Sequence, residues 1–282
     1  MNPTPNRLST RLLLVDVDGT LIGPGTYPTP RVSEAIAATQ DRGVAVALST
    51  GRATEACYHL LNQLKLEGLH IFFNGAAIID WPSNDVIYLL ALPPEPARRL
   101  VHLSREYGVF LEIYSHNYYF VERDDEITAN QRRKLAIEPV ITDLEKLCGR
   151  LKIVKGQLVA PDEASKQAAQ VISDKMQGLC EMGLSIDPSN NWAFVNAIAR
   201  NVSKGATARY LADYLGLDRS EIMAVGDSYN DIDLFREAGF SVALEPAPPG
   251  LREIADAIVP SVNEDGLAVA IEKYVLRDSP DA

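Results

Sequence analysis

The chain has 282 residues, of which 46% are hydrophobic and 23% charged, a balance typical of a soluble globular protein and unlike that of a disordered one. At about 100–200 residues per domain, this length predicts two domains, with one large domain as the alternative. The 27 Lys and Arg residues against 38 Asp and Glu residues give a net charge of −11. That charge argues against nucleic acid and anionic membranes as partners, because both are bound by clustered cations.

Cysteine usage and hydropathy narrow the class of protein further. Cys57, Cys148 and Cys180 are far apart and form no C-x-x-C pair, so neither a zinc cluster nor a disulfide framework is expected. No stretch reaches the about 18 consecutive apolar residues of a spanning helix, and the first residues lack the apolar run of a secretory signal. We expect a cytoplasmic protein that acts as a monomer or homodimer.

The first part of the chain alternates strands and helices. Short apolar runs predict buried parallel strands at Leu12–Val15, Val44–Leu48 and Ile71–Phe73. Helices are predicted over Ser33–Arg42, which stops at a glycine, and over Ala53–Leu64. Strand and helix in this order are typical of a parallel sheet with crossover helices.

The middle of the chain has a different pattern. A helix is predicted over Glu95–Tyr107 and another after Pro161, ending near Met176. Strands are predicted at Val86–Leu92, Val109–Tyr114, Tyr118–Glu122, Lys152–Val159, Glu181–Ile186 and Trp192–Val195. The second and third of these strands, and the last two, pair naturally as hairpins, which predicts an α+β domain with an antiparallel sheet.

From Ser203 the α/β pattern returns. Helices are predicted at Lys204–Leu215, Asp231–Ala238 and Leu251–Ala255, and strands at Ile222–Val225, Ser241–Ala243 and Ile258–Val259. The fold class is therefore α/β, a Rossmann-like doubly wound parallel-sheet core made of 1–82 and 197–282. Residues 83–196 are expected to form an inserted α+β domain.

Two acidic motifs follow predicted strands. Asp16-Val17-Asp18-Gly19-Thr20 comes directly after the first strand, and Gly226-Asp227-Ser228-Tyr229-Asn230-Asp231 ends a later one. Ligands of open α/β sheets bind beyond the carboxyl ends of strands. Carboxylates there can hold Mg²⁺, which prefers an octahedral oxygen shell, or divide the roles of nucleophile and acid/base. The plainer alternatives are a solvated D-G turn and a helix cap.

Two further segments could hold an anion. Ser49-Thr50-Gly51-Arg52 follows the second strand with a hydroxyl, backbone amides and a guanidinium group. In Ser203-Lys204-Gly205 a lysine stands at a helix start, where it opposes the helix dipole and requires an anionic partner. The alternatives are an ordinary N-cap and a surface lysine.

In this order the four motifs resemble those of the haloacid dehalogenase superfamily of phosphohydrolases, with D-x-D-G-T complete, Thr50 in T-G-R, Lys204 in V-S-K-G and G-D-x-x-N-D complete. The insertion resembles the α/β cap of the Cof-type subfamily, as does Asn74-Gly75-Ala76. The likeness covers nearly the whole chain beyond about Leu12.

The resemblance implies a two-step phosphoryl transfer. Asp16 would be the nucleophile and Asp18 the acid and then base, with Thr50 and Lys204 holding phosphoryl oxygens. Mg²⁺ would bind Asp16, Asp18 and Asp227, with Asn230 and Asp231 completing the set, Asp231 at its edge. Substrate contacts would come from Gly19, Thr20, Gly51, Arg52, Asn74 and Gly75.

The same resemblance leaves substrate choice open. Pro246 and Asn196 stand where the family often has Asn and Glu. Specificity is expected from the cap, with Tyr114, His116, Tyr118, Tyr119 and Trp192 as candidates; ordinary packing is the alternative for each.

We expect a Mg²⁺-dependent phosphatase of a small phosphorylated metabolite, above all a sugar phosphate. The alternatives are a phosphomannomutase-like phosphotransferase, a dedicated sucrose-phosphate or mannosylglycerate-phosphate type of phosphatase, and a non-catalytic sensor of a phosphorylated ligand.

Overall fold

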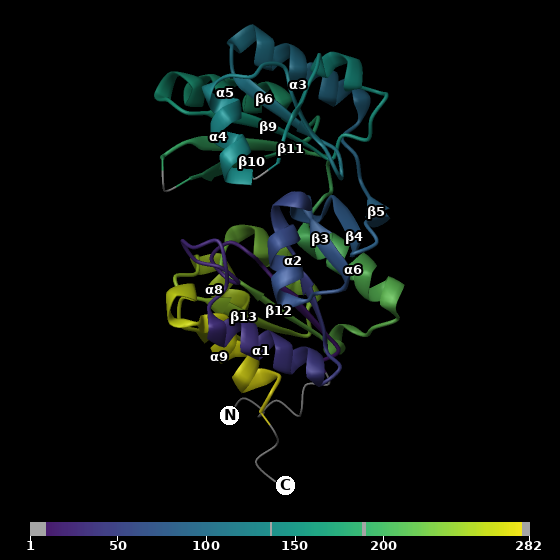
Figure 1. The fold of residues 1–282 in the computed structure, drawn as a ribbon, viewed down its shortest axis with the longest axis vertical. Helices are drawn as coiled ribbons and strands as arrows, with labels where there is room; N and C mark the ends of the chain where they lie inside the picture. The colour runs from purple at the N-terminus through teal and green to yellow at the C-terminus, as the bar shows by residue number, and fades with distance from the viewer. Residues whose placement is uncertain (1–9, 136, 188–189, 278–282) are drawn as a thin grey trace. The chain divides into compact units, whose positions relative to one another are not determined.

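A computed structural model of the chain describes residues 10–135, 137–187 and 190–277 (Figure 1). It separates into two compact units. The core unit comprises Met1–Gly51, His59–Asp85 and Ser203–Ala282, and the cap unit comprises Arg52–Tyr58 and Val86–Val202. The predicted fold class, a parallel α/β sheet with an additional α+β part, is confirmed.

The core unit is built on a five-stranded parallel sheet with the order β14-β13-β12-β1-β2. Its strands are β1 (Leu12–Val15), β2 (Ala45–Leu48), β12 (Ile222–Gly226), β13 (Phe240–Leu244) and β14 (Ala257–Val259). All four side chains of β1 are buried, and the strand pairs with a neighbour on each side. An interior strand of the sheet, flanked by β2 and β12, therefore leads into the first acidic motif.

Helices and single turns connect these strands. The α-helices are α1 (Pro30–Asp41), α2 (Tyr58–Leu64), α6 (Lys204–Leu215), α7 (Ile232–Glu237), α8 (Pro249–Ile254) and α9 (Gly266–Tyr274). The 3₁₀ turns are η1 (Glu55–Cys57), η2 (Phe73–Gly75), η4 (Arg219–Glu221), η5 (Tyr229–Asp231) and η6 (Val262–Glu264). The first helix starts earlier than predicted, since Thr29 caps it and Pro30 suits its first turn. The predicted helix over Ala53–Leu64 is divided between η1 and α2.

The third predicted strand pairs differently from the expectation. β3 (Gly68–Phe72) belongs to a separate sheet of the order β3-β4-β5, with β4 (Ala77–Trp81) and β5 (Asp85–Leu89), and runs antiparallel to β4. Asn74 and Gly75 adopt positive φ angles of 57° and 100°, which reverse the chain there. A single parallel bridge between Ser49 and Ile71 links β3 to the end of β2.

The cap unit has a six-stranded sheet of the order β10-β11-β9-β6-β7-β8. Its elements are α3 (Pro94–Tyr107), β6 (Phe110–Tyr114), β7 (Tyr119–Val121), α4 (Glu126–Leu135), β8 (Val140–Ile141), η3 (Leu144–Leu147), β9 (Lys155–Ala160), α5 (Glu163–Met176), β10 (Glu181–Ile186) and β11 (Ala193–Ile198). The predicted hairpins β6–β7 and β10–β11 are confirmed. An apolar core joins one face of this sheet to α3 and α5.

All three cysteines are buried thiols. Among the described residues, no helix has both the length and the apolar composition needed to cross a bilayer.

We expect His70 in β3 to make the core unit sensitive to acid. Its side chain is fully buried, and its Nδ1 accepts a hydrogen bond of 3.1 Å from the Leu48 amide. Burial lowers the pKa of His70 to about 4. The unfolded chain therefore takes up a proton near pH 6.5, at which the folded protein does not.

We predict that this histidine lowers the free energy of unfolding by about 3 kcal/mol as the pH falls from 7 to 4. In His70→Asn, whose amide oxygen can still accept from Leu48, that part of the pH dependence disappears even though lost packing destabilises the variant. Urea unfolding at several pH values measures both effects, with His102→Asn as the exposed control. Equal pH dependence in wild type and His70→Asn would show that His70 is not the acid-sensitive group.

Candidate active site

The loops after β1, β2 and β12 meet at one edge of the core sheet. Val15 is in register with Leu48 on one side and with Val225 on the other. The chain therefore leaves three neighbouring parallel strands at the same edge of the sheet, with loops that begin at Asp16, Ser49 and Asp227, where ligands bind in this class of sheet.

Lys204 joins the first and last motifs in a buried ion cluster. Its Nζ donates to Asp16 Oδ1 at 2.5 Å and to Asp231 Oδ1 at 2.7 Å, and only 1% of the residue is exposed. It opens α6 after the N-cap Ser203, whose hydroxyl accepts from the Ala206 amide. A cation at a helix start is unfavourable because it opposes the helix dipole, and here the two carboxylates offset that cost. They are the anionic partners that the sequence predicts for Lys204.

Asp231 organises the loop around Asp227. While its Oδ1 accepts from Lys204, its Oδ2 accepts from the backbone amides of Asp227 and Ser228, both at 3.1 Å. The Ser228 hydroxyl adds a contact of 3.3 Å to the same atom. Both oxygens of Asp231 are thus engaged by the protein. Ser228 was not a predicted site residue, although Ser-x-x-Asp is a recognisable capping pattern.

Asp227 packs directly on the first motif. Thr20 donates from its hydroxyl to Asp227 Oδ1 at 2.8 Å. Gly19 has a φ of +86°, and a Cβ atom there would lie 2.3 Å from Asp227 Oδ2. Only glycine combines this conformation with so close an approach of a carboxylate, so Gly19 and Thr20 position Asp227 beside the loop that carries Asp16 and Asp18.

The electrostatics of the cluster favour an additional cation. Burial raises the pKa of Asp16 well above its usual range, with partial opposition from Lys204. Burial also raises the pKa of Asp227 to about 6, against the hydrogen bond from Thr20. Burial alone would lower the pKa of Lys204, but Asp16 and Asp231 outweigh it and raise the value. One lysine therefore faces three clustered carboxylates, which leaves negative charge uncompensated.

The donor set fits a hard divalent cation. Asp16, Asp227 and Asp231 each have a carboxylate oxygen within 4.8 Å of the others. Few carboxylates at a partly buried loop edge suit Mg²⁺, which keeps several waters and shares a site with phosphate. Because both oxygens of Asp231 are engaged, Asp16 and Asp227 are the better ligands. Asn230 contacts Ser228 and Asn74 instead, at 2.5 and 3.2 Å.

The remaining predicted residues flank this cluster or lie outside the core unit. The Asp18 side chain is exposed to solvent at the same loop. Thr50 is fully buried, and its carbonyl accepts from the Asn74 amide at 2.9 Å. The Gly75 carbonyl accepts from the Thr207 hydroxyl at 2.5 Å, which ties η2 to α6. Gly51 ends the core segment, and Arg52 begins the segment that belongs to the cap unit.

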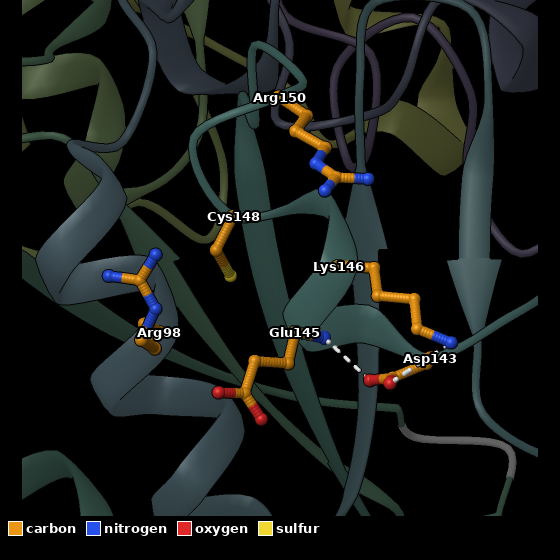
Figure 2. A pocket seen from close by; sticks show the side chains of 6 residues that line it. All are labelled: Arg98, Asp143, Glu145, Lys146, Cys148 and Arg150. Carbon is orange, nitrogen blue, oxygen red and sulfur yellow. Dashed lines mark hydrogen bonds and ion pairs between the residues drawn. The ribbon is translucent and has the colours of Figure 1, made fainter.

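A separate pocket of about 350 Å³ lies on the cap unit (Figure 2). Arg98, Asp143, Glu145, Lys146, Cys148 and Arg150 line it. Most of these side chains already have partners. Arg105 donates to Asp143 at 2.7 Å and to Glu145 at 2.9 Å, Lys146 pairs with Asp143 at 3.6 Å, and Arg98 pairs with Glu95. None of the predicted site residues is among the six that line it.

Known proteins resemble this chain over the segment that carries the four motifs. The family model described as haloacid dehalogenase-like hydrolase matches residues 13–271. A Streptococcus pyogenes protein whose name assigns it to the phosphatases is 30% identical over 278 residues, covering 96% of this chain and 100% of its own. A Bacillus subtilis 5-amino-6-(5-phospho-D-ribitylamino)uracil phosphatase is 29% identical over 266 residues, covering 94% and 96%.

Solved structures agree on the fold. A haloacid dehalogenase-like hydrolase from Bacteroides thetaiotaomicron superposes with a TM-score of 0.81 over 94% of this chain and 99% of its own, at 24% identity. The match of the family model spans both units and all four motifs, and the Streptococcus relative is matched over its whole length. The chain belongs to the haloacid dehalogenase-like hydrolases and is an enzyme of their phosphatase type.

Proposed function

We propose that the protein is a Mg²⁺-dependent phosphatase of a small phosphorylated metabolite, above all a sugar phosphate, which works through an aspartyl-phosphate on Asp16. In this proposal, residues 1–82 and 197–282 are the catalytic core and residues 83–196 are the cap that selects the substrate. The observation that carries the proposal is the buried Asp16 carboxylate at the end of β1, held by Lys204 at 2.5 Å.

Asp16 is the nucleophile in this scheme. One oxygen of its carboxylate attacks phosphorus while the bond from phosphorus to the leaving oxygen breaks, and Lys204 holds the carboxylate in place through Oδ1. A nucleophile fixed by a buried cation needs no reorientation in the transition state. The product of this step is a phosphoryl group on Asp16 and a leaving group that requires a proton.

Asp18 supplies that proton. Two residues further along the same loop, it is exposed to solvent, where water and a leaving group can reach it. Its carboxyl group gives a proton to the leaving oxygen and then takes one from the water that attacks the phosphoryl group. Inorganic phosphate leaves, and both carboxyl groups return to their initial states.

The residues around Asp16 would neutralise the negative charge of the phosphate. Asp16 and Asp227, with the Asp18 carbonyl, would hold Mg²⁺, which supplies positive charge next to the phosphate. Phosphoryl transfer depends mainly on positioning and electrostatic stabilisation. Lys204, Thr50 and the amides of the surrounding loops would hold the phosphoryl oxygens, and Arg52 and Asn74 would contact the substrate.

The alternatives differ in where the phosphate goes. A phosphomannomutase-like enzyme returns it to a sugar, whereas any phosphatase, including a sucrose-phosphate or mannosylglycerate-phosphate type, releases it to water. A non-catalytic sensor would not need Asp16, Asp18 and Asp227 together, and all three are present. Release of inorganic phosphate from a panel of phosphorylated metabolites separates these functions.

Asp16→Asn tests the nucleophile. An amide cannot form the acyl phosphate, so kcat for p-nitrophenyl phosphate should fall by about 10³-fold or more, with an unchanged circular dichroism spectrum. Asp213→Asn, an exposed change of the same kind on α6, should retain full activity. Substantial phosphate release by Asp16→Asn would contradict the role of Asp16.

Removal of divalent cations tests the metal. Excess EDTA should abolish phosphate release and an excess of Mg²⁺ should restore it, because the carboxylates of Asp16 and Asp227 would otherwise repel the phosphate. A full rate in excess chelator would exclude a metal from the reaction.

Lys204→Met tests the buried ion cluster. Removing the cation leaves two buried carboxylates without their partner, so the free energy of unfolding should fall by about 3–5 kcal/mol. Adding Asp231→Asn should recover part of that loss. Urea unfolding measures both, with the exposed Lys152→Met as control; a loss of less than about 1 kcal/mol in Lys204→Met would refute the coupling.

A further inference from the structure

The cap sheet has one long open edge. Among the described residues β10 pairs with a single neighbour, β11, and β8 forms the opposite edge of the same sheet. β10 is six residues long, whereas β8 has only two. The edge strands of the core sheet are also shorter, with four residues in β2 and three in β14. β10 therefore offers the longest free edge of these two sheets.

β10 lacks the features that usually protect an edge strand. Such strands are very short, contain a bulge, or carry lysine or proline. The sequence of β10, EMGLSI, has neither of these residues. Its register with β11 is unbroken from the pair Glu181–Ile198 to the pair Ile186–Ala193. An edge of this kind is a template on which another strand can pair.

The backbone groups of alternate β10 residues point out of the sheet. Just beyond the strand, the Asp187 amide donates to the Trp192 carbonyl at 2.9 Å. Hydrogen-bonded pairs alternate along an antiparallel ladder, so every second residue counted back from Asp187 bonds to β11. The N–H and C=O groups that point outward belong to the residues between them, Met182, Leu184 and Ile186.

The same three residues form an apolar row. Side chains alternate along a strand, so the three share one face of the sheet. Met182 packs against the apolar core with α3 and α5, whereas Leu184 is 63% exposed and Ile186 is 54% exposed. On β11 their opposite residues, Val195 and Ala193, are buried in that core. The apolar face of the cap sheet therefore continues to its edge and is left uncovered there.

A second copy of β10 complements this edge. If two antiparallel β10 strands are related by a two-fold axis at Leu184, the outward groups of Leu184 pair with those of Leu184 in the second copy. The outward groups of Met182 then pair with those of Ile186 in the second copy, so each finds a partner. Apolar side chains meet at all of these positions. One contact thus removes both the unpaired backbone groups and the exposed apolar surface.

The charged residues near the ends of β10 are compatible with this pairing. Glu181 of one copy comes opposite Asp187 of the other. Asp187 is neutralised by Lys134, whose Nζ lies 2.6 Å from its Oδ2. Lys134 is exposed and its ammonium group has further hydrogens, while Glu181 has no ion pair among the described residues. A cation therefore stands on each side to offset the approach of the two acidic side chains.

The pairing closes on itself. A two-fold contact uses the same strand of both copies and leaves neither β10 free. The joined sheet ends on both sides in β8, which is too short to recruit a further strand. The edge therefore favours two copies and not an open filament.

We propose that the protein forms a homodimer in which the β10 strands of two copies pair antiparallel about Leu184 and join the two cap sheets into one. The contact lies entirely within the cap units and does not depend on phosphatase activity.

Leu184→Lys tests the interface. Analytical ultracentrifugation of wild type between about 1 and 100 μM should show a species with twice the mass of one chain. Lysine at the two-fold axis faces its own copy, so repulsion should raise the Kd of the dimer by at least about 10-fold. Because residue 184 is exposed, the circular dichroism spectrum should be unchanged.

Ile141→Lys is the matched control. Ile141 is 52% exposed on β8, the opposite edge of the same sheet. Its substitution adds the same charge to an equally exposed apolar position, and the Kd of the dimer should change by less than about twofold.

Leu184→Cys tests the register. Hydrogen-bonded antiparallel residues have Cα atoms about 5.5 Å apart, so a thiol-reactive cross-linker with a span of about 5 Å should join two Leu184→Cys chains. In Ile186→Cys the two thiols would be about 14 Å apart, and the same reagent should give little product. Wild type is the background control, because its cysteines are buried.

Three results would overturn the proposal. Wild type that stays monomeric at about 100 μM would exclude the homodimer and leave the edge available to a strand of another protein. A dimer that Leu184→Lys does not weaken would have its contact elsewhere. Cross-linking of Ile186→Cys in preference to Leu184→Cys would exclude the antiparallel pairing about Leu184.

Discussion

The buried contact of Lys204 with Asp16 and Asp231 is the constraint on which the active site depends. It joins residues 188 and 27 positions apart in the chain, and each partner would be unfavourable alone. Lysine in a dry interior at a helix start, and two carboxylates with little solvent, are tolerated because they compensate one another. The same contact fixes the start of α6 relative to β1, and Asp231 extends it to the amides of the Asp227 loop. A site with this concentration of negative charge would attract Mg²⁺. A phosphate would bind there only together with that cation.

The two units differ in how the charges of their buried polar side chains are balanced. In the core unit, one lysine faces the carboxylates of Asp16, Asp227 and Asp231, so negative charge is in excess. In the cap unit, the buried side chains of Glu112 and Lys155 carry opposite charges, and Glu112 Oε1 has no hydrogen-bond partner among the described residues. Burial raises the pKa of Glu112 and lowers that of Lys155 to about 8, which reflects how little solvent reaches them. The excess of negative charge in the core unit favours an additional cation there.

Much of the core could be predicted from the sequence because its signals are local. Apolar runs ending in Asp16, Ser49 and Gly226 mark strands whose carboxyl ends share an edge, and the register of β1 with β2 and β12 aligns them. Strand direction is not local, so β3 was expected in the parallel sheet although it pairs antiparallel with β4. The helix α4 escaped prediction because its buried side chains, Thr128 and Gln131, are polar. The burial of Glu112 was not predicted for the same reason, because a polar residue in an alternating strand is expected to face solvent, whereas Glu112 is 0% exposed.

We propose that the phosphoryl group is transferred to Asp16 before water releases it as inorganic phosphate. The most direct measurement is acid quenching of wild type within milliseconds of mixing with radiolabelled p-nitrophenyl phosphate and Mg²⁺, followed by peptide mapping of the labelled protein. We expect an acid-stable, base-labile label on the peptide that contains Asp16. This label should disappear after a chase with unlabelled ester. Rapid turnover with no label on the protein, or a label on any other residue, would contradict it.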